Sequence, residues 1–423
     1  MAKNKSNIFA IVIMFFLFAM ISFVTGLQNP FGVIVKNQFG ASNFMSQLGN
    51  AANFIAYAFM GLPAGFLLSK KGYKFTSLAA VVVGFVGVGI MFLSGITESF
   101  GIYLLGAFVS GFSMCMLNTV VNPMLNTLGG GGNKGNQLIQ WGGSLNSLSA
   151  TIVPVFVGYL IGNAANARIS DANPALFIAM GIFAAAFLII FFSYIPEPEL
   201  ESGKKEEAKD STMDTVKGAL SFRHFVCGII AIFLYVGVEV GIPNFVNLYM
   251  TSPAVGISAA VAGTVVGMYW FLMLCGRLIG GAVGGKVSSR TMMTIVSSVA
   301  VLLLCLGMFL GDSSMIKFPA ITSDLKFSLE AIPVGVMFFI LCGLCTSVMW
   351  GAIFNLAVEG LGKYTSIASG LFMVMVCGGG ILPLIQGVVA DSTSYLTSYV
   401  VIILAVLYIL WYALAGSKVK KNA

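Results

Sequence analysis

Twelve apolar stretches, each long enough to cross a lipid bilayer, dominate this chain of 423 residues. A hydrocarbon core of about 30 Å requires roughly 20 apolar residues in a helix. Charged residues make up 9% of the sequence and hydrophobic residues 58%, whereas a soluble protein needs far more charge on its surface. We therefore expect an all-α, polytopic membrane protein. Its spans are expected at residues 8–31, 44–68, 75–94, 100–125, 138–161, 174–195, 225–250, 259–283, 292–310, 332–358, 366–389 and 395–415.

The basic residues predict how these spans are oriented. With an even number of spans both termini lie on one side, and most of the 22 Lys and Arg residues fall on that side. They are Lys3, Lys5, Lys70, Lys71, Lys74, Lys134, Lys204, Lys205, Lys209, Lys217, Arg223, Lys286, Arg290, Lys363, Lys418, Lys420 and Lys421. The opposite side carries Lys36, Arg168, Lys317 and Lys326, and Arg277 lies inside span 8. By the positive-inside rule the basic side is cytoplasmic.

This charge pattern predicts a multi-pass protein of the cell (inner) membrane with both termini in the cytoplasm. The net charge of +7 is explained by topology, so we expect the lipid bilayer and no nucleic acid as a partner. We also expect a monomer.

One segment of the chain has the composition of a linker. Residues 199–221 include the charged run ESGKKEEAKD and few apolar side chains, and such a segment cannot bury enough surface to fold alone. It separates six spans from six. We therefore expect an N-terminal six-helix bundle at residues 1–198, a cytoplasmic linker at 199–221, and a C-terminal six-helix bundle at 222–423.

Landmarks of the first half recur in the second half, in the same order. The equivalent pairs are Lys70 and Lys286, Lys74 and Arg290, Asn122 and Asn355, Pro154 and Pro383, and Gly158 and Gly387. Transporters built from repeated units bind substrate near the bilayer midplane, between the repeats, and rock one unit against the other. We expect gating or structural roles for Lys70, Arg277, Lys286 and Arg290.

Several motifs spread over the chain carry a resemblance to a known family. They are VTGLQNPFGVIVKNQF (24–39), GLPAGFLLSKKGYK (61–74), NTVVNPMLNTLG (118–129), LNSLSATIVP (145–154), YVGVEVGIPNF (235–245), CGRLIGG (275–281), GLCTSVMWGAIFNLAVEGLGKYTSIASG (343–370) and GGGILPLIQGVVAD (378–391). With these motifs the chain resembles the major facilitator superfamily, and within it the fucose/glucose/galactose permease family of sugar:cation symporters. The resemblance implies the major facilitator fold, a cavity lined by spans 1, 4, 7 and 10, and secondary active import of a monosaccharide by alternating access.

The chain departs from that family pattern at two positions. The fucose branch carries an acidic residue near the end of span 1 and another in span 4, where this chain has Asn29 and Asn118. An amide cannot take up and release a proton, so a proton relay through these two sites is not expected. A facilitative uniporter, or an exporter or antiporter of another small polar solute, stays open as an alternative.

Glu239 in span 7 is the one carboxylate expected deep inside the membrane. An acid in hydrocarbon costs several kcal/mol unless it has a partner or a wet cavity, and Arg277 is one candidate partner. Glu239 is a candidate sugar hydroxyl acceptor and the candidate coupling residue, with Na⁺ narrowly favoured over H⁺. We expect no cofactor and no resident metal, only transient Na⁺ near Glu239, and a transporter in place of an enzyme.

Amide side chains cluster in the spans expected to line the cavity. Asn and Gln offer a donor and an acceptor in one planar group, which suits sugar hydroxyls. The candidates for substrate binding are Gln28, Asn29, Asn118, Asn122, Gln140, Asn146, Asn244, Asn355 and Gln386. For any one amide, a hydrogen bond between helices is the favoured explanation, whereas for the whole set a polar cavity explains the pattern better.

Aromatic side chains supply the other half of sugar recognition, because the apolar face of a pyranose stacks on a ring. The candidates are Trp141, Tyr235, Tyr269, Trp270 and Trp350, of which Tyr235 and Trp350 are the favoured pair.

Overall fold

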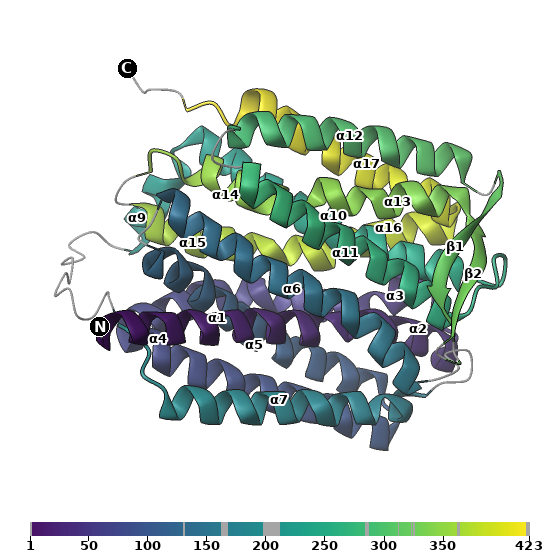
Figure 1. Cartoon of the computed structure of the whole chain (residues 1–423), viewed down its shortest axis with the longest axis horizontal. Helices are drawn as coiled ribbons and strands as arrows, with labels where there is room; N and C mark the ends of the chain where they lie inside the picture. The colour runs from purple at the N-terminus through teal and green to yellow at the C-terminus, as the bar shows by residue number, and fades with distance from the viewer. Residues whose placement is uncertain are drawn as a thin grey trace.

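The computed structural model describes residues 2–129, 132–161, 168–197, 212–283, 287–311, 313–322, 324, 326–361 and 364–419. Long helices run side by side along one axis of the molecule (Figure 1). Eleven helices within this described part are long and apolar enough to cross a membrane. The remaining expected span corresponds to α6 (Gly132–Ile161), whose 30 residues are also long enough to cross.

The N-terminal bundle contains the first six spans. Its elements are α1 (Ala2–Gly26), α2 (Gln28–Phe39), α3 (Asn43–Ser46), α4 (Leu48–Thr97), α5 (Phe100–Leu128), α6, η1 (Ile169–Ala172) and α7 (Asn173–Phe192). The helix α4 holds two spans, joined by a turn at Gly72, whose φ of 81° lies in the left-handed region.

The C-terminal bundle contains the other six spans and a β-hairpin. Its elements are α9 (Thr212–Leu220), α10 (Arg223–Met250), α11 (Ala259–Val283), α12 (Ser289–Leu310), β1 (Met315–Ile321), β2 (Phe327–Pro333), α13 (Val334–Thr346), α14 (Met349–Val358), α15 (Thr365–Val374), η3 (Met375–Cys377), α16 (Gly378–Ser392), α17 (Tyr395–Trp411) and η4 (Tyr412–Gly416).

The hairpin corrects one predicted boundary. Strands β1 and β2 pair antiparallel, with Met315 opposite Pro333 and Ile321 opposite Phe327. Ile332, the predicted first residue of span 10, lies in β2, and the helix begins at Val334. Pro333 is the N-cap of that helix; it ends the strand because it lacks a backbone N–H. The boundary of an apolar run is therefore not the boundary of a helix here.

Several of the expected spans are interrupted, including the following three. Span 1 changes from α1 to α2 at Leu27, span 10 changes from α13 to α14 at Ser347 and Val348, and span 11 passes through the single 3₁₀ turn η3. Discontinuous helices occur in transporters where the backbone approaches a substrate site. All three interruptions lie in helices that reach the cavity described below.

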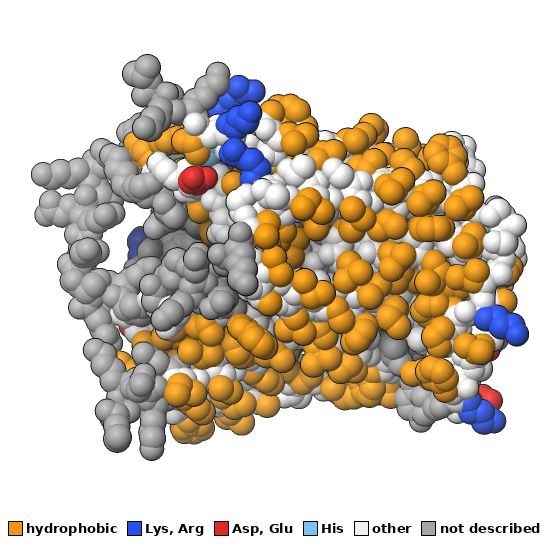
Figure 2. Space-filling view, turned by 45° about the horizontal axis from the view of Figure 1, so that its top comes forward, with side chains coloured by type: hydrophobic (Ala, Val, Ile, Leu, Met, Phe, Trp, Pro, Cys, Tyr) orange, Lys and Arg blue, Asp and Glu red, His pale blue; other side chains and the backbone are white. Residues whose placement is uncertain are grey.

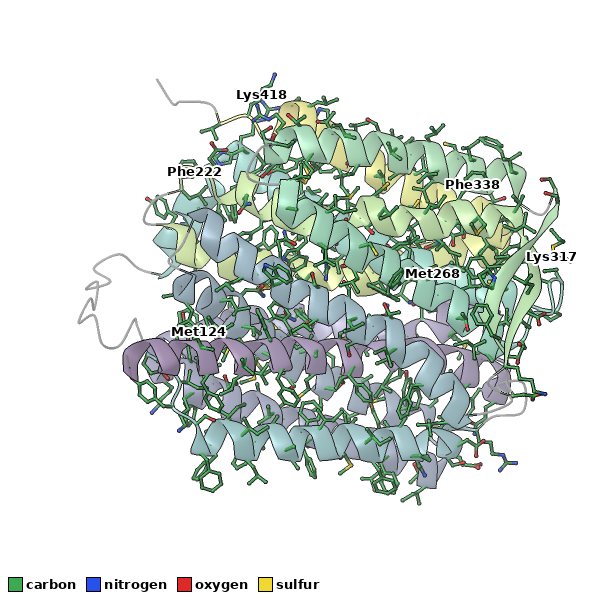
Figure 3. All side chains as sticks on the ribbon, viewed as in Figure 1. Met124, Phe222, Met268, Lys317, Phe338 and Lys418 are labelled. Carbon is green, nitrogen blue, oxygen red and sulfur yellow. The ribbon has the colours of Figure 1, made fainter. Side chains whose placement is uncertain are left out.

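The molecule has two polar ends and an apolar belt. We call the end where α1 begins, α4 turns and η4 ends the basic face, and the end that carries β1 and β2 the hairpin face (Figure 1). Lys418 lies at the basic face and Lys317 at the hairpin face (Figure 3). Figure 2 shows apolar side chains covering the surface between these ends, as expected for lipid contact.

Lys74 and Arg290, the equivalent basic residues of the two bundles, make similar hydrogen bonds. Lys74 donates through Nζ to the carbonyls of Phe191 and Ser193, at the end of span 6, over 2.9 and 2.8 Å. Arg290 donates to the hydroxyl and carbonyl of Ser417, after span 12, over 3.3 Å each. Each cation thus binds the carboxyl end of the last helix of its own bundle. The pairing of Lys74 with Arg290 inferred from the sequence therefore extends to their contacts.

The bundles meet along two pairs of helices, α6 with α11 and α4 with α16. At the hairpin face a group of four polar side chains, Lys36, Asn43, Asp391 and Tyr395, joins them; we call it the rim cluster. Lys36 Nζ donates to Asn43 Oδ1 (2.5 Å) and to the Tyr395 hydroxyl (2.6 Å). Asp391 accepts from Asn43 Nδ2 (2.7 Å) and from the backbone N–H of Asn43 (3.1 Å). This end of the interface is therefore held together by side chains of both bundles.

Candidate substrate cavity

A cavity of about 1230 Å³, open in part to solvent, lies between the two bundles. Spans 1, 4, 7 and 10 all line it, as the family resemblance implies, and spans 2, 5, 8 and 11 contribute as well. The polar lining residues are Ser22, Thr25, Asn50, Tyr57, Asn118, Asn122, Gln140, Asn146, Glu239, Asn244, Arg277 and Ser347.

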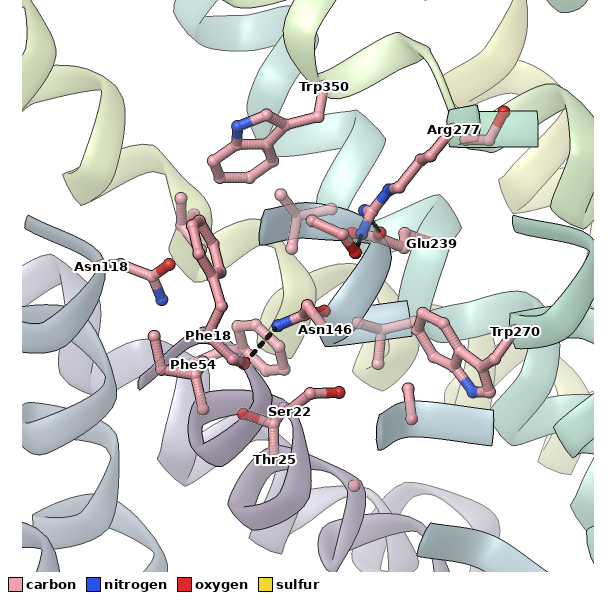
Figure 4. Close-up of a pocket in the computed structure, with 18 of the residues that line it drawn as sticks. Phe18, Ser22, Thr25, Phe54, Asn118, Asn146, Glu239, Trp270, Arg277 and Trp350 are labelled. Atoms are coloured by element: carbon pink, nitrogen blue, oxygen red, sulfur yellow. Dashed lines mark hydrogen bonds and ion pairs between the residues drawn. The ribbon is translucent and has the colours of Figure 1, made fainter. Parts of the chain in front are cut away.

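One acid and one base face each other on the cavity wall. Arg277 on α11 reaches Glu239 on α10 with 3.3 Å between the guanidinium nitrogen Nη2 and the carboxylate oxygen Oε1 (Figure 4). Their side chains are 11% and 14% exposed. Tyr235, one turn before Glu239 on α10, is fully buried. The pair balances the charge of the cavity, because no other Lys, Arg, Asp or Glu among the described residues lines it.

The cavity amides are oriented by hydrogen bonds within and between helices. Asn118 donates to the Tyr57 hydroxyl over 3.0 Å, and Asn122 donates to the carbonyl of Asn118 over 2.9 Å. Asn146 on α6 donates to the carbonyl of Phe18 on α1 over 3.2 Å (Figure 4). These bonds fix the planes of the amides, so that the wall presents polar groups at set positions.

Asn244 at the far end of α10 makes a contact between the bundles. Its Nδ2 donates to Oε1 of Gln47 over 2.9 Å. Nearby, Asn50 donates to the carbonyl of Gly379 over 2.9 Å. The hairpin-face end of the cavity is therefore bounded by polar contacts between the bundles.

Two tryptophans stand on different sides of the cavity. Trp350 on α14 and Trp270 on α11 flank the Glu239–Arg277 pair (Figure 4). Trp350 is held by edge contacts with Tyr235 and Phe372, at ring-centroid distances of 6.2 and 5.8 Å. Trp270 is held by an edge contact with Tyr269 at 5.3 Å. These T-shaped contacts hold the two indole rings in place at the cavity wall.

The comparisons with known proteins agree with this architecture. Residues 14–383 match the family model described as Major Facilitator Superfamily. The chain belongs to the Major Facilitator Superfamily. A glucose/galactose transporter of Brucella abortus biovar 1 (strain 9-941) is 30% identical over 99% of this chain and 96% of its own length. The L-fucose-proton symporter of Escherichia coli (strain K12) is 22% identical over 93% of this chain and 90% of its own length.

Solved structures of two transporters share the fold. The transporter FucP in the outward conformation has a TM-score of 0.72 at 20% identity and covers 98% of this chain and 100% of its own. The nucleoside transporter NupG has a TM-score of 0.64 at 14% identity and covers 98% of this chain and 99% of its own. The predicted fold of twelve helices in two bundles is confirmed, and the protein is a member of a transporter superfamily, not an enzyme.

Three of the substrate-binding residues predicted from the sequence do not line the cavity. Tyr235 is fully buried behind the wall, against Trp350 and beside Glu239. Gln386 is fully buried on α16, where its Nε2 donates to the Ser398 hydroxyl of α17 over 3.4 Å. Asn355 is exposed on α14, two helical turns closer to the basic face than the cavity residue Ser347. Their helices reach the cavity, but these side chains lie on other helix faces or levels.

Other candidates fall outside or beside the cavity. The side chains of Gln28 and Asn29, and the whole of Lys286, lie outside the described residues. Lys70 is exposed at the basic face, and Trp141 is 59% exposed. Tyr269 is buried, with its hydroxyl 3.0 Å from that of Thr346. Of the aromatic candidates, Trp270 and Trp350 line the cavity.

Span 2, and the span 1 side chains Phe18 and Ser22, line the cavity without having been predicted from the sequence. Asn50, Phe54 and Tyr57 lie on successive turns of α4 and line the cavity, as do Phe18 and Ser22 on α1. The spacing of Asn50, Phe54 and Tyr57 is that of one helix face. An amide in an apolar span, one turn from an aromatic side chain, is the signal that could have identified span 2.

Proposed function

We propose that the protein imports a neutral monosaccharide, a hexose or a close relative, by alternating access. The observation that carries the proposal is the cavity between the bundles, which combines amides on four helices with the indole rings of Trp270 and Trp350. Amides match the hydroxyls of a sugar, and the indole faces match its apolar side. The printed names of two relatives, a glucose/galactose transporter and an L-fucose-proton symporter, support a sugar as the substrate.

The charges of the cavity favour a neutral sugar over an acidic one. An acidic sugar needs a cation to bind its carboxylate. Arg277 is the base among the described lining residues, and it already pairs with Glu239 at 3.3 Å. A sugar carboxylate would have to compete with Glu239 for it and would leave a second negative charge in the cavity. A neutral hexose meets no such repulsion.

Import is proposed to be coupled to a cation at Glu239. This carboxylate lines the same cavity as the amides, so that a cation and a sugar bound there would be neighbours. Na⁺ takes oxygen ligands, which a carboxylate, neighbouring amides and sugar hydroxyls would supply; protonation of the carboxylate is the alternative. An exporter of apolar compounds would need an apolar cavity, and this lining is rich in amides.

The orientation is part of the proposal. The described basic residues Lys70, Lys71, Lys74, Lys217, Arg290 and Lys418 belong to the basic face, which we place in the cytoplasm of the cell by the positive-inside rule. A cysteine in place of Lys70 should react with an impermeant thiol reagent only from the cytoplasmic side. A cysteine in place of Lys317, on the hairpin, should react only from outside. The reverse pattern would refute the orientation.

Sugar counterflow in proteoliposomes tests the substrate. Vesicles preloaded with one sugar would be assayed for exchange against labelled glucose, galactose, fucose and glucuronate. We expect exchange of at least one neutral hexose and none of glucuronate. Accumulation above the equilibrium level, measured with an imposed Na⁺ gradient and separately with a pH gradient, identifies the cation. Accumulation under neither gradient, with exchange intact, would leave a uniporter; absence of all sugar exchange would overturn the proposal.

A further inference from the structure

The guanidinium of Arg277 binds both bundles at once. Through Nη2 it faces Glu239 of its own bundle at 3.3 Å. Through Nη1 it donates to the carbonyl of Gly143 over 2.6 Å and to the hydroxyl of Ser147 over 2.9 Å, both on α6 of the other bundle. Since α6 and α11 pack against each other between the bundles, these hydrogen bonds cross the surface that must rearrange during alternating access.

The acceptors on α6 are arranged for this cation. Gly143 and Ser147 are one helical turn apart and so lie on the same helix face. Ser147 is fully buried and does not line the cavity, so its hydroxyl is available to Arg277 but not to a sugar. A methyl group at position 143 would lie 3.4 Å from Nη1 of Arg277, an ordinary van der Waals contact, so the guanidinium packs directly against this part of α6.

Charge balance links these two sets of bonds. With Glu239 negative, Arg277 is shared between its counter-charge and α6. A cation bound to Glu239 weakens its attraction for Arg277, because the charges of carboxylate and cation cancel. An unpaired guanidinium inside a membrane has a high free-energy cost. Once Glu239 is neutralised, the acceptors that remain for Arg277 are Gly143 and Ser147 on the other bundle.

We propose that Arg277 is a positioning residue that transmits cation binding at Glu239 to the contact between the bundles. Loading Glu239 shifts the guanidinium toward α6 and tightens that contact; release of the cation returns Arg277 to Glu239 and loosens it. This inference rests on the proposed coupling at Glu239. By reciprocity, a bond that cation binding strengthens must itself strengthen cation binding.

The test removes an acceptor on α6 without touching the cavity. In Ser147→Ala, Arg277 loses one partner in the other bundle and competes more strongly for Glu239. We expect the cation concentration for half-maximal sugar uptake to rise about threefold to tenfold, as for the loss of one hydrogen bond. Sugar exchange at saturating cation should stay close to wild type. Arg277→Lys, which keeps the charge but loses the planar fork, should show the same rise.

Thr151→Ala is the matched control. Its hydroxyl donates over 2.8 Å to the carbonyl of Ser147, one turn further along α6, and does not contact Arg277. We expect no change in its cation dependence. An unchanged cation dependence in Ser147→Ala and in Arg277→Lys, with wild-type uptake still driven by the cation, would overturn the role of Arg277 and leave the proposed function intact. Wild-type uptake that no cation stimulates would instead overturn the coupling at Glu239 and this inference together.

Discussion

The rim cluster at the hairpin face and the Arg277 contact beside the cavity both join the two bundles, but they differ in their partners. Asp391 is exposed, and the rim side chains Lys36, Asn43 and Tyr395 do not line the cavity. Arg277, by contrast, shares the cavity wall with Glu239. A ligand biases an equilibrium only through interactions that differ between the two states. The rim cluster is therefore expected to set the resting balance between states, and the Arg277 contact to make that balance respond to ligand.

The two contacts also differ in how they are built. At the rim, Asp391 accepts from the backbone N–H groups of Asn43 and Phe44, at the start of α3, over 3.1 and 3.2 Å. A carboxylate at the beginning of a helix satisfies donors that have no partner within the helix. At the cavity, one side chain divides its donors between a charge in its own bundle and neutral acceptors in the other. Only the second arrangement changes when Glu239, the carboxylate of the cavity, is neutralised.

The largest expected effect follows from neutralising the cavity carboxylate. Glu239→Gln keeps the shape of the side chain but removes the charge that binds the cation. We expect gradient-driven accumulation of sugar to be lost completely, while exchange persists at a reduced rate. Removing one partner of a buried ion pair also destabilises the protein, by about 3–5 kcal/mol when the pair is fully buried. Thermal unfolding in detergent checks that the variant remains folded. Full accumulation by the variant would refute coupling at Glu239.

An intermediate effect is expected at the rim. Asp391→Ala removes the acceptor of three hydrogen bonds from Asn43 and Phe44. At about 0.5–1.5 kcal/mol each, and less where water replaces them, their loss should shift the balance toward a state open at the hairpin face by about tenfold. The readout is the labelling rate of Ser22→Cys, a cavity-lining position, by an impermeant reagent applied from the hairpin face. The cation dependence of uptake should change less than in Ser147→Ala.

The fold could be predicted from the sequence because its strongest signal is local. A run of apolar residues long enough for a bilayer identifies a span without knowledge of its neighbours, and the repeat of Lys74 as Arg290 required only an offset. The hairpin between spans 9 and 10 was missed. Its strands have few apolar positions that face a core, and the pairing of Met315 with Pro333 depends on a turn whose geometry the composition does not specify.

The sequence predicted most of the helices that line the candidate site, but it predicted less well which of their side chains face the cavity. Most of these helices are apolar on all sides, because one face meets lipid and another meets protein. The sequence pattern then does not indicate which face turns to the cavity. Asn118, Asn122 and Asn146 lie on the cavity wall, whereas Gln386, on an equally apolar helix, is rotated toward α17. A helix break, such as the one before Trp350, also changes which face of the following helix turns to the cavity.

The smallest expected effect tests whether sugar affinity is set at the cavity wall alone. Asn122 lines the cavity, and its repeat-related partner Asn355 is exposed on α14. Asn122→Ala should weaken sugar binding about threefold to fivefold, because one amide donor or acceptor is lost while the neighbouring amides remain. Asn355→Ala should bind sugar as the wild type does, although the two positions are equivalent in sequence. Equilibrium binding of labelled sugar at fixed cation concentration measures both. Equal losses in the two variants would mean that the repeat, and not the cavity seen in this structure, determines which amides meet the sugar.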